Sequence, residues 1–129
     1  MGKKVAVLVV DDSPICQQLI SDALRKDPEL EIVATAANGR EAVDLCKTLK
    51  PNVITMDVDM PVMDGRLAMS ALRSDPRTFK TPIIVLTAHA SPEDVAAAIE
   101  AGCYSYETKP VVMRRLLERI EEALQPVAK

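Results

Sequence analysis

The sequence lacks the features that mark membrane, secreted and nucleic-acid-binding proteins. No apolar run approaches the ~18 residues of a membrane-spanning segment. Lys and Arg number 16 against 19 Asp and Glu, a net charge of −3, so no excess of positive charge suggests nucleic-acid binding. The first residues contain no apolar signal segment, and Ala6 stands where a myristoylation signal needs Ser or Thr. We therefore expect a soluble, cytoplasmic protein that binds neither nucleic acid directly nor membranes.

Cysteine and histidine are also scarce. Cys16, Cys46 and Cys103 are odd in number and have no C-x-x-C spacing, so neither a disulfide framework nor a zinc site is indicated. His89 is the only histidine, and no Ser–His or Cys–His pair is indicated that would activate a hydroxyl or thiol nucleophile. If the protein forms a covalent intermediate, its nucleophile is therefore expected to be a carboxylate.

Apolar runs alternate with segments of helical periodicity along the whole chain. Continuous apolar runs predict three buried strands, and two weaker runs predict two shorter ones. Capping residues followed by apolar stripes at helical spacing predict the helices between them. The predicted strands cover residues 3–10, 31–36, 53–57, 82–87 and 103–108, and the predicted helices cover residues 14–26, 39–50, 66–74, 92–100 and 113–124.

Strands that alternate with helices, and that are apolar throughout, indicate a parallel sheet covered on both faces. Right-handed crossovers on a chain of 129 residues favour an open sheet rather than a barrel. We predict a (βα)5 flavodoxin-like doubly wound sandwich, a five-stranded parallel sheet with strand order 2-1-3-4-5. Residues 1–125 would form one domain, and residues 126–129 a C-terminal tail or a linker stub.

Polar residues follow four of the five predicted strands. Asp11 and Asp12 end the first strand, Asp57 the third and Thr87 the fourth, and Lys109 follows the fifth. Because the carboxyl ends of parallel strands meet at one edge of the sheet, these side chains should converge. Clustered carboxylates without His or Cys suit Mg²⁺, and a lysine with a hydroxyl beside them suits a phosphoryl group.

Asp57 is the best-placed nucleophile of the three carboxylates. It ends the apolar run 53–57, and attack on phosphorus would produce an aspartyl phosphate. Mg²⁺ and Lys109 would offset the charge on the phosphoryl oxygens, as in phosphoryl transfer generally. The small residue Ala88 lets its backbone N–H approach that group.

These residues occur in motifs that resemble a known family. The combination resembles the receiver domain of bacterial two-component response regulators over essentially the whole chain. The motifs that carry the resemblance are Asp11-Asp12, Asp57 with Met60-Pro61-x-Met63-Asp64-Gly65, Thr87-Ala88 and Lys109-Pro110.

The resemblance implies a phospho-acceptor in two-component signalling. Asp57 would accept a phosphoryl group from a histidine kinase or a phosphotransfer protein, and the only chemistry would be self-phosphorylation and slow self-dephosphorylation. Asp12 and Asp57 would bind Mg²⁺ directly, Asp11 through water, and the Asp59 carbonyl would complete the metal site. Thr87, Ala88 and Lys109 would hold the phosphate.

The resemblance also implies a switch and an output surface. Tyr106 matches the aromatic residue that turns inward when Thr87 is drawn to the phosphate, and Asp59 and His89 occupy positions that tune hydrolysis of the acyl phosphate. Helix four, strand five and helix five would bind the output partner or domain, and the protein would be a monomer or a phosphorylation-linked dimer. Two residues depart from the family pattern: Val111 stands where Phe often follows Lys-Pro, and Tyr104 adds a second aromatic.

Other interpretations of the segment around Asp57 fit less well. Asp57-Val58-Asp59 also resembles the D-x-D motif of haloacid-dehalogenase-type phosphatases, in which Asp59 would be the general acid, but Pro61 replaces the expected Thr or Val and the motif belongs on a first strand. A flavodoxin-like cofactor site lacks a Ser/Thr/Gly-rich phosphate loop after the first strand. Pro61 also occupies a ligand position of an EF-hand.

Overall fold

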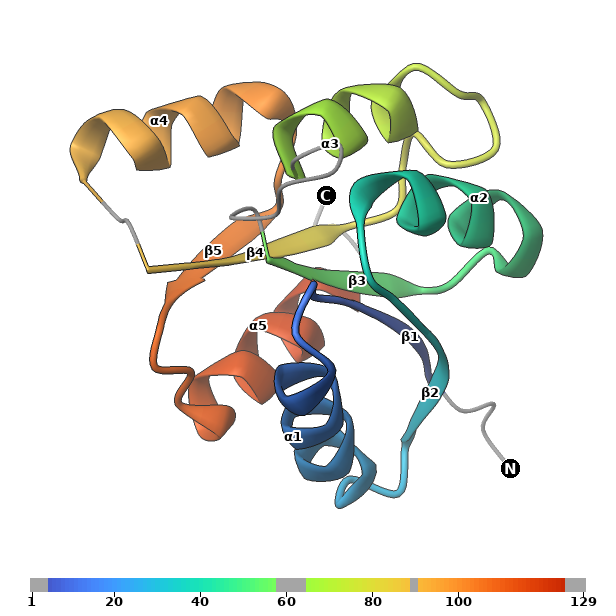
Figure 1. The fold of residues 1–129 in the computed structure, drawn as a ribbon, viewed down its shortest axis with the longest axis vertical. Helices are drawn as coiled ribbons and strands as arrows, with labels where there is room; N and C mark the ends of the chain where they lie inside the picture. The colour runs from blue at the N-terminus through green and yellow to red at the C-terminus, as the bar shows by residue number, and fades with distance from the viewer. Residues whose placement is uncertain (1–4, 58–64, 89–90, 125–129) are drawn as a thin grey trace, which may run out of the picture.

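The computed structural model describes residues 5–57, 65–88 and 91–124, which form five strands and five helices in strict alternation (Figure 1). None of the described helices is long and apolar enough to cross a membrane. The elements are β1 (Val5–Val10), α1 (Pro14–Arg25), β2 (Leu30–Ala36), α2 (Gly39–Leu49), β3 (Val53–Asp57), α3 (Gly65–Arg73), β4 (Ile83–Thr87), α4 (Pro92–Ala101), β5 (Ser105–Thr108) and α5 (Met113–Leu124).

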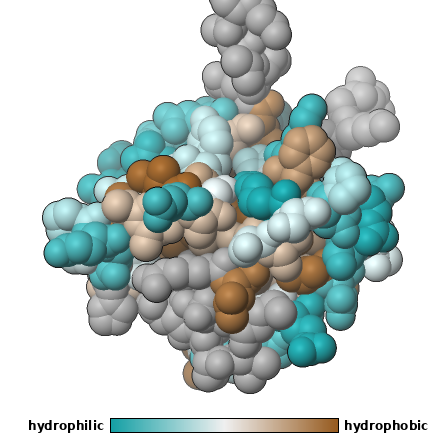
Figure 2. Space-filling model, turned by 90° about the horizontal axis from the view of Figure 1, so that it is seen from above, coloured by the Kyte–Doolittle hydropathy of each residue, from teal (hydrophilic) through white to brown (hydrophobic). Residues whose placement is uncertain are grey.

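All five strands are parallel, and their order β2-β1-β3-β4-β5 confirms the prediction. β1 and β3 lie side by side in the middle of the sheet, where Val10 pairs with Met56. Helices α1 and α5 cover one face of the sheet, and α2, α3 and α4 cover the other (Figure 1). On the face formed by α2, α3 and α4, apolar surface occurs in separate patches among hydrophilic residues (Figure 2).

Each face of the sheet has its own hydrophobic core. Successive side chains of a strand point to opposite faces, so a strand that is covered on both sides is apolar at every position. Leu8 and Val10 belong to the core under α2, α3 and α4, whereas Val7 and Val9 belong to the core under α1 and α5. This two-sided burial explains the continuous apolar runs of the sequence.

Side chains cap the helices where the sequence predicts it. The Ser13 hydroxyl accepts from the Cys16 N–H at 3.3 Å, and the Asn38 side-chain oxygen accepts from the Glu41 N–H at 2.9 Å. Ser91 caps α4 in the same way, and Gly102 ends it with φ 111°, a left-handed conformation that glycine adopts without steric cost. These local contacts set where each connection leaves the sheet.

Several helix and strand ends differ from the prediction by one residue, and two differences are larger. Ile15 and Leu19 keep helical spacing but are 72% and 64% exposed, because the buried face of α1 consists of Ile20, Ser21 and Leu24. The last strand also begins at residue 105 rather than 103. The Cys103 N–H donates to the carbonyl of Ala98 and so closes α4 instead of extending β5.

Candidate functional site

Four strand ends bring the predicted site residues to one edge of the sheet. Asp11 directly follows β1, Asp57 is the last residue of β3, and Thr87 is the last residue of β4. Lys109 follows β5, and its N–H donates to the Thr87 carbonyl at 2.8 Å, which extends the pairing of β4 with β5 by one bond. The parallel register therefore carries these residues to the same edge.

The carboxylates of Asp11, Asp12 and Asp57 form one cluster. Each offers an oxygen, and these oxygens all lie within 4.8 Å of one another. Asp11 and Asp57 are only 1% and 2% exposed, whereas Asp12 is exposed. The cluster therefore has two buried members and one member open to solvent.

Asp11 is held in an environment that disfavours its charge. Burial raises its pKa, the hydrogen bond from the Ser13 N–H to Oδ1 at 2.9 Å opposes that rise, and the negative charge of Asp57 adds to it. The second oxygen, Oδ2, is buried and has no hydrogen-bond partner within the described part of the chain. A buried carboxylate oxygen without a partner is costly unless a ligand satisfies it.

The chemistry of these residues fits a divalent cation. Three carboxylates supply oxygen donors, which Mg²⁺ prefers, and among the described residues no His or Cys joins the cluster. A cation at this position would satisfy Asp11 Oδ2 and relieve the repulsion among the three charges. The donor set and the unsatisfied oxygen therefore both fit a divalent cation such as Mg²⁺.

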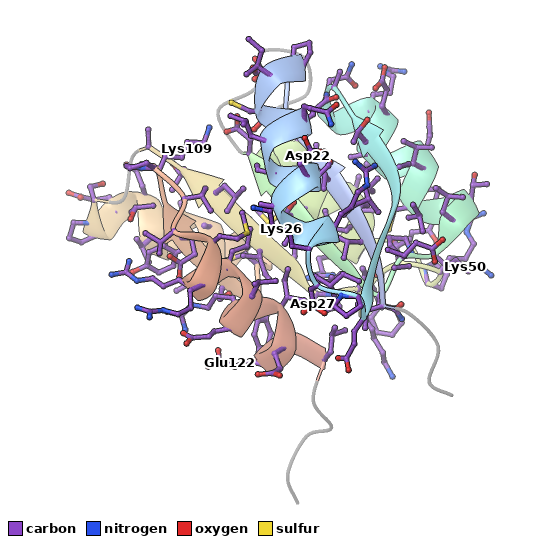
Figure 3. The ribbon with its side chains drawn as sticks, turned by 90° about the horizontal axis from the view of Figure 1, so that it is seen from below. Asp22, Lys26, Asp27, Lys50, Lys109 and Glu122 are labelled. Carbon is purple, nitrogen blue, oxygen red and sulfur yellow. The ribbon has the colours of Figure 1, made fainter. Side chains whose placement is uncertain are left out.

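Lys109 provides positive charge to the same cluster. Its ammonium lies 3.0 Å from Oδ2 of Asp57, and its side chain is 29% exposed. In Figure 3, Lys109 lies on the side of the molecule where α1 begins, whereas Lys26 and Asp27 lie where α1 ends. The site therefore combines a buried carboxylate, a partly exposed ammonium and the buried Thr87.

Two predicted site residues, Asp59 and His89, lie outside the described residues. Ala88 is exposed directly after β4, and Tyr106 lies within β5 with 37% of its surface exposed. Asp57 ends the third strand along the chain, whereas the phosphatase motif considered above belongs on a first strand.

One supporting residue, Gln17, was not predicted from the sequence. Its side-chain amide donates to the carbonyl of Asp11 at 2.6 Å and to the carbonyl of Ala36 at 3.3 Å. Gln17 thereby connects the first turn of α1 to the carboxyl ends of β1 and β2. The feature of the sequence that could have indicated this role is a polar residue one helical turn after the helix cap Ser13.

The comparisons with known proteins agree with this geometry. The family model of the response regulator receiver domain matches residues 7–121. The chain belongs to the response regulator receiver family. Its fold is that of receiver domains in solved structures: the response regulator domain of Thermotoga maritima CheB has a TM-score of 0.86 at 29% identity, covering 95% of this chain and 97% of that one. The chemotaxis response regulator CheY4 of Vibrio cholerae has a TM-score of 0.85 at 35% identity, covering 95% and 100%.

Curated relatives of this receiver domain are longer proteins. A protein-glutamate methylesterase/protein-glutamine glutaminase of Nocardioides sp. is 40% identical over 127 residues, which is 95% of this chain and 34% of that protein. A second such protein, from Carboxydothermus hydrogenoformans, is 40% identical over 128 residues, which is 96% of this chain and 35% of that protein. The receiver domain thus spans about a third of the length of these relatives.

Proposed function

We propose that this receiver domain accepts a phosphoryl group on Asp57 from a histidine kinase or a phosphotransfer protein, with Mg²⁺ held by Asp11, Asp12 and Asp57. One observation carries the proposal: buried Asp57 lies in a cluster of three carboxylates and is paired with the ammonium of Lys109 at 3.0 Å. The Asp59 carbonyl would complete the metal ligands. Bound Mg²⁺ would supply charge neutralisation for the phosphoryl oxygens.

Each residue of the site has a separate role in phosphoryl transfer. A carboxylate oxygen of Asp57 forms a bond to phosphorus while the bond from phosphorus to the donor nitrogen breaks. The Lys109 ammonium stabilises negative charge on the phosphoryl oxygens. The Thr87 hydroxyl and the Ala88 N–H donate hydrogen bonds to the same group. Asp59 and His89 would set how long the acyl phosphate persists.

The output surface is assigned to α4, β5 and α5. A groove of about 570 Å³ lies there, with exposed Ile99, Tyr104 and Tyr106 on its walls and Arg115 and Arg119 beside them. Phosphorylation would draw the Thr87 hydroxyl toward the phosphate and let Tyr106 turn inward, which changes this surface.

The partner at this surface would be an output domain, a separate protein or a second copy of the chain, so the receiver domain is a monomer or a phosphorylation-linked dimer. The methylesterase relatives are about three times as long as this chain, so we assign to the chain the regulatory role and no activity beyond its own phosphorylation and dephosphorylation. We place the protein in the cytoplasm, where a kinase partner would act.

Labelling with a small phosphodonor tests the proposal. Incubation with acetyl phosphate and Mg²⁺ should add one acid-stable, base-labile phosphoryl group, detected by mass spectrometry. Asp57→Asn should abolish the label, and Asp22→Asn, which changes an exposed aspartate of α1, should retain it. Labelling that survives Asp57→Asn would contradict the assignment.

A further inference from the structure

A second groove opens beside the phosphoryl site. Its volume is about 340 Å³, near the lower limit of small-molecule pockets. One wall comes from α1, and the other comes from the segment between β5 and α5 together with the first residue of α5. The apolar lining residues are Cys16, Leu19, Ile20, Pro110, Val111 and Met113.

The groove reaches the phosphoryl site at two residues. Asp11 and Lys109 complete its lining, and both flank Asp57: Lys109 through its ion pair, and Asp11 through the carboxylate cluster. A phosphoryl group in transfer to Asp57 would therefore have a cation and an apolar hollow next to it. Such a combination suits a ligand with an anionic head and a short apolar chain.

We propose that this groove accepts the apolar chain of an acyl phosphate, so that the protein takes phosphoryl groups from acyl phosphates longer than acetyl phosphate in preference to acetyl phosphate itself. The inference rests on the proposed function of Asp57 and names a class of donor for it. An Asp57 carboxylate oxygen forms the new bond to phosphorus, and the bond from phosphorus to the acyl oxygen breaks. The donor leaves as a carboxylate, which keeps the electron pair of the broken bond, and no proton is transferred.

The size of the expected preference follows from the buried chain. Butanoyl phosphate is longer than acetyl phosphate by two methylene groups, and burying both in the groove should raise the rate constant about tenfold. The two leaving carboxylates are almost equally basic, so intrinsic reactivity contributes little to the ratio. The groove itself is therefore the source of any large difference.

The test compares the second-order rate constants for phosphorylation of Asp57 by the two donors in the presence of Mg²⁺, using the full chain. Val111→Phe should fill the groove and bring the ratio of butanoyl to acetyl rate constants close to one. Val112→Phe is the matched control, because Val112 is the next residue, is 45% exposed and does not line the groove. Wild type and Val112→Phe should both keep a ratio of about ten.

A second variant covers the case in which Val111→Phe does not fold. Leu19→Ala removes part of the opposite wall at a side chain that is 64% exposed, and it should lower the ratio a few-fold. A wild-type ratio near one, or a ratio unchanged by both groove variants, would overturn the inference while leaving Asp57 as the acceptor. If neither donor labels Asp57, the proposed function itself fails.

Discussion

The ammonium of Lys109 pairs with Oδ2 of Asp57 at 3.0 Å across an intervening strand. Asp57 ends β3 and Lys109 follows β5, while β4 lies between these two strands in the sheet. The pair therefore joins strand ends that share no backbone ladder. It also brings positive charge to a cluster of three carboxylates, two of them buried.

Lys109→Met should destabilise the metal-free protein. The substitution leaves the buried Asp57 carboxylate without this cation, and because Lys109 is 29% exposed we expect a loss of about 1–3 kcal/mol in the free energy of unfolding. Urea denaturation in the presence of a chelator measures it. Lys26→Met, at an exposed lysine after α1, should change stability by less than about 0.5 kcal/mol. Equal effects of the two substitutions would contradict a structural role for the ion pair.

Mg²⁺ should stabilise the protein against heat. A cation that binds only the folded cluster adds about 1.4 kcal/mol at a concentration ten times its Kd, which raises Tm by a few degrees. Asp12→Asn removes one carboxylate at the exposed side of the cluster and should abolish most of this rise. Differential scanning calorimetry with and without Mg²⁺ measures both. A rise of the same size in Asp12→Asn would remove Asp12 from the metal site.

Asp11 should make the metal-free protein less stable as pH rises. Burial raises its pKa above the ordinary 3.8, so the folded state holds this proton more tightly than the unfolded state does. Below pH 3.8, Asp11 keeps its proton in both the folded and the unfolded state, so ionisation costs the folded state nothing. The cost grows as pH rises from 3.8 through the higher pKa of the folded state. Asp11→Asn keeps an oxygen for the Ser13 N–H and avoids that cost.

The stability gained in Asp11→Asn should therefore be larger at neutral pH than near 3.8. Urea denaturation in a chelator at both pH values gives the comparison. A gain that is the same at both would show that the charge of Asp11 is not its cause.

The fold was predictable because its signals are local. Continuous apolar runs identify strands covered on both faces, and Ser13, Asn38 and Ser91 cap helices through contacts three residues away. The convergence of Asp11, Asp57 and Lys109 follows from the same logic, since parallel strands carry their carboxyl ends to one edge.

Features that depend on tertiary packing were not predictable. The sequence does not distinguish Asp11 from Asp12, yet one is 1% exposed and the other is open to solvent, because the chain turns between them. The exposure of Leu19 depends on how much of α1 the sheet and α5 cover. Glu107 is an acid within a strand, and only its arginine partners on α5 explain why it is 4% exposed.

Replacing Glu107 and replacing Arg119 should change the free energy of unfolding by different amounts, although the two residues form one ion pair. The Glu107 carboxylate lies 2.9 Å from Arg119 and 3.8 Å from Arg115, whose side chains are 41% and 59% exposed. Glu107→Val removes the buried charge and lets the arginines return to water, so we expect a change within about 1 kcal/mol. Arg119→Met leaves the buried carboxylate with its more distant partner and should cost about 1–3 kcal/mol.

The control for this pair is Arg114→Met on the same helix. Arg114 makes no ion pair with the rest of the described chain, so its replacement should change the free energy of unfolding by less than about 0.5 kcal/mol. Urea denaturation of the three variants measures these changes in the free energy of unfolding. If Glu107→Val costs more than Arg119→Met, desolvation of the carboxylate is not the dominant contribution.

Arg73 should be among the costliest arginines of the domain to replace. Its guanidinium donates twice to the carbonyl of Gly102, at 3.0 and 2.7 Å, and once each to the carbonyls of Phe79 and Thr81, at 3.0 and 2.7 Å. Burial lowers its pKa, because removal from water disfavours the charged form. It thereby ties the end of α3 to the loop before β4 and to the turn between α4 and β5.

Arg73→Met keeps the apolar stem and deletes all four hydrogen bonds, so we expect a loss of about 2–4 kcal/mol in the free energy of unfolding. Arg77→Met is the matched control: Arg77 is 56% exposed and pairs with Asp75 at 2.9 Å, an arrangement worth at most about 1 kcal/mol. Arg73→Lys should fall between them, because an ammonium cannot reach three carbonyls with the fixed geometry of a guanidinium. Urea denaturation that ranks Arg77→Met as the more damaging change would show that the carbonyl contacts of Arg73 contribute little.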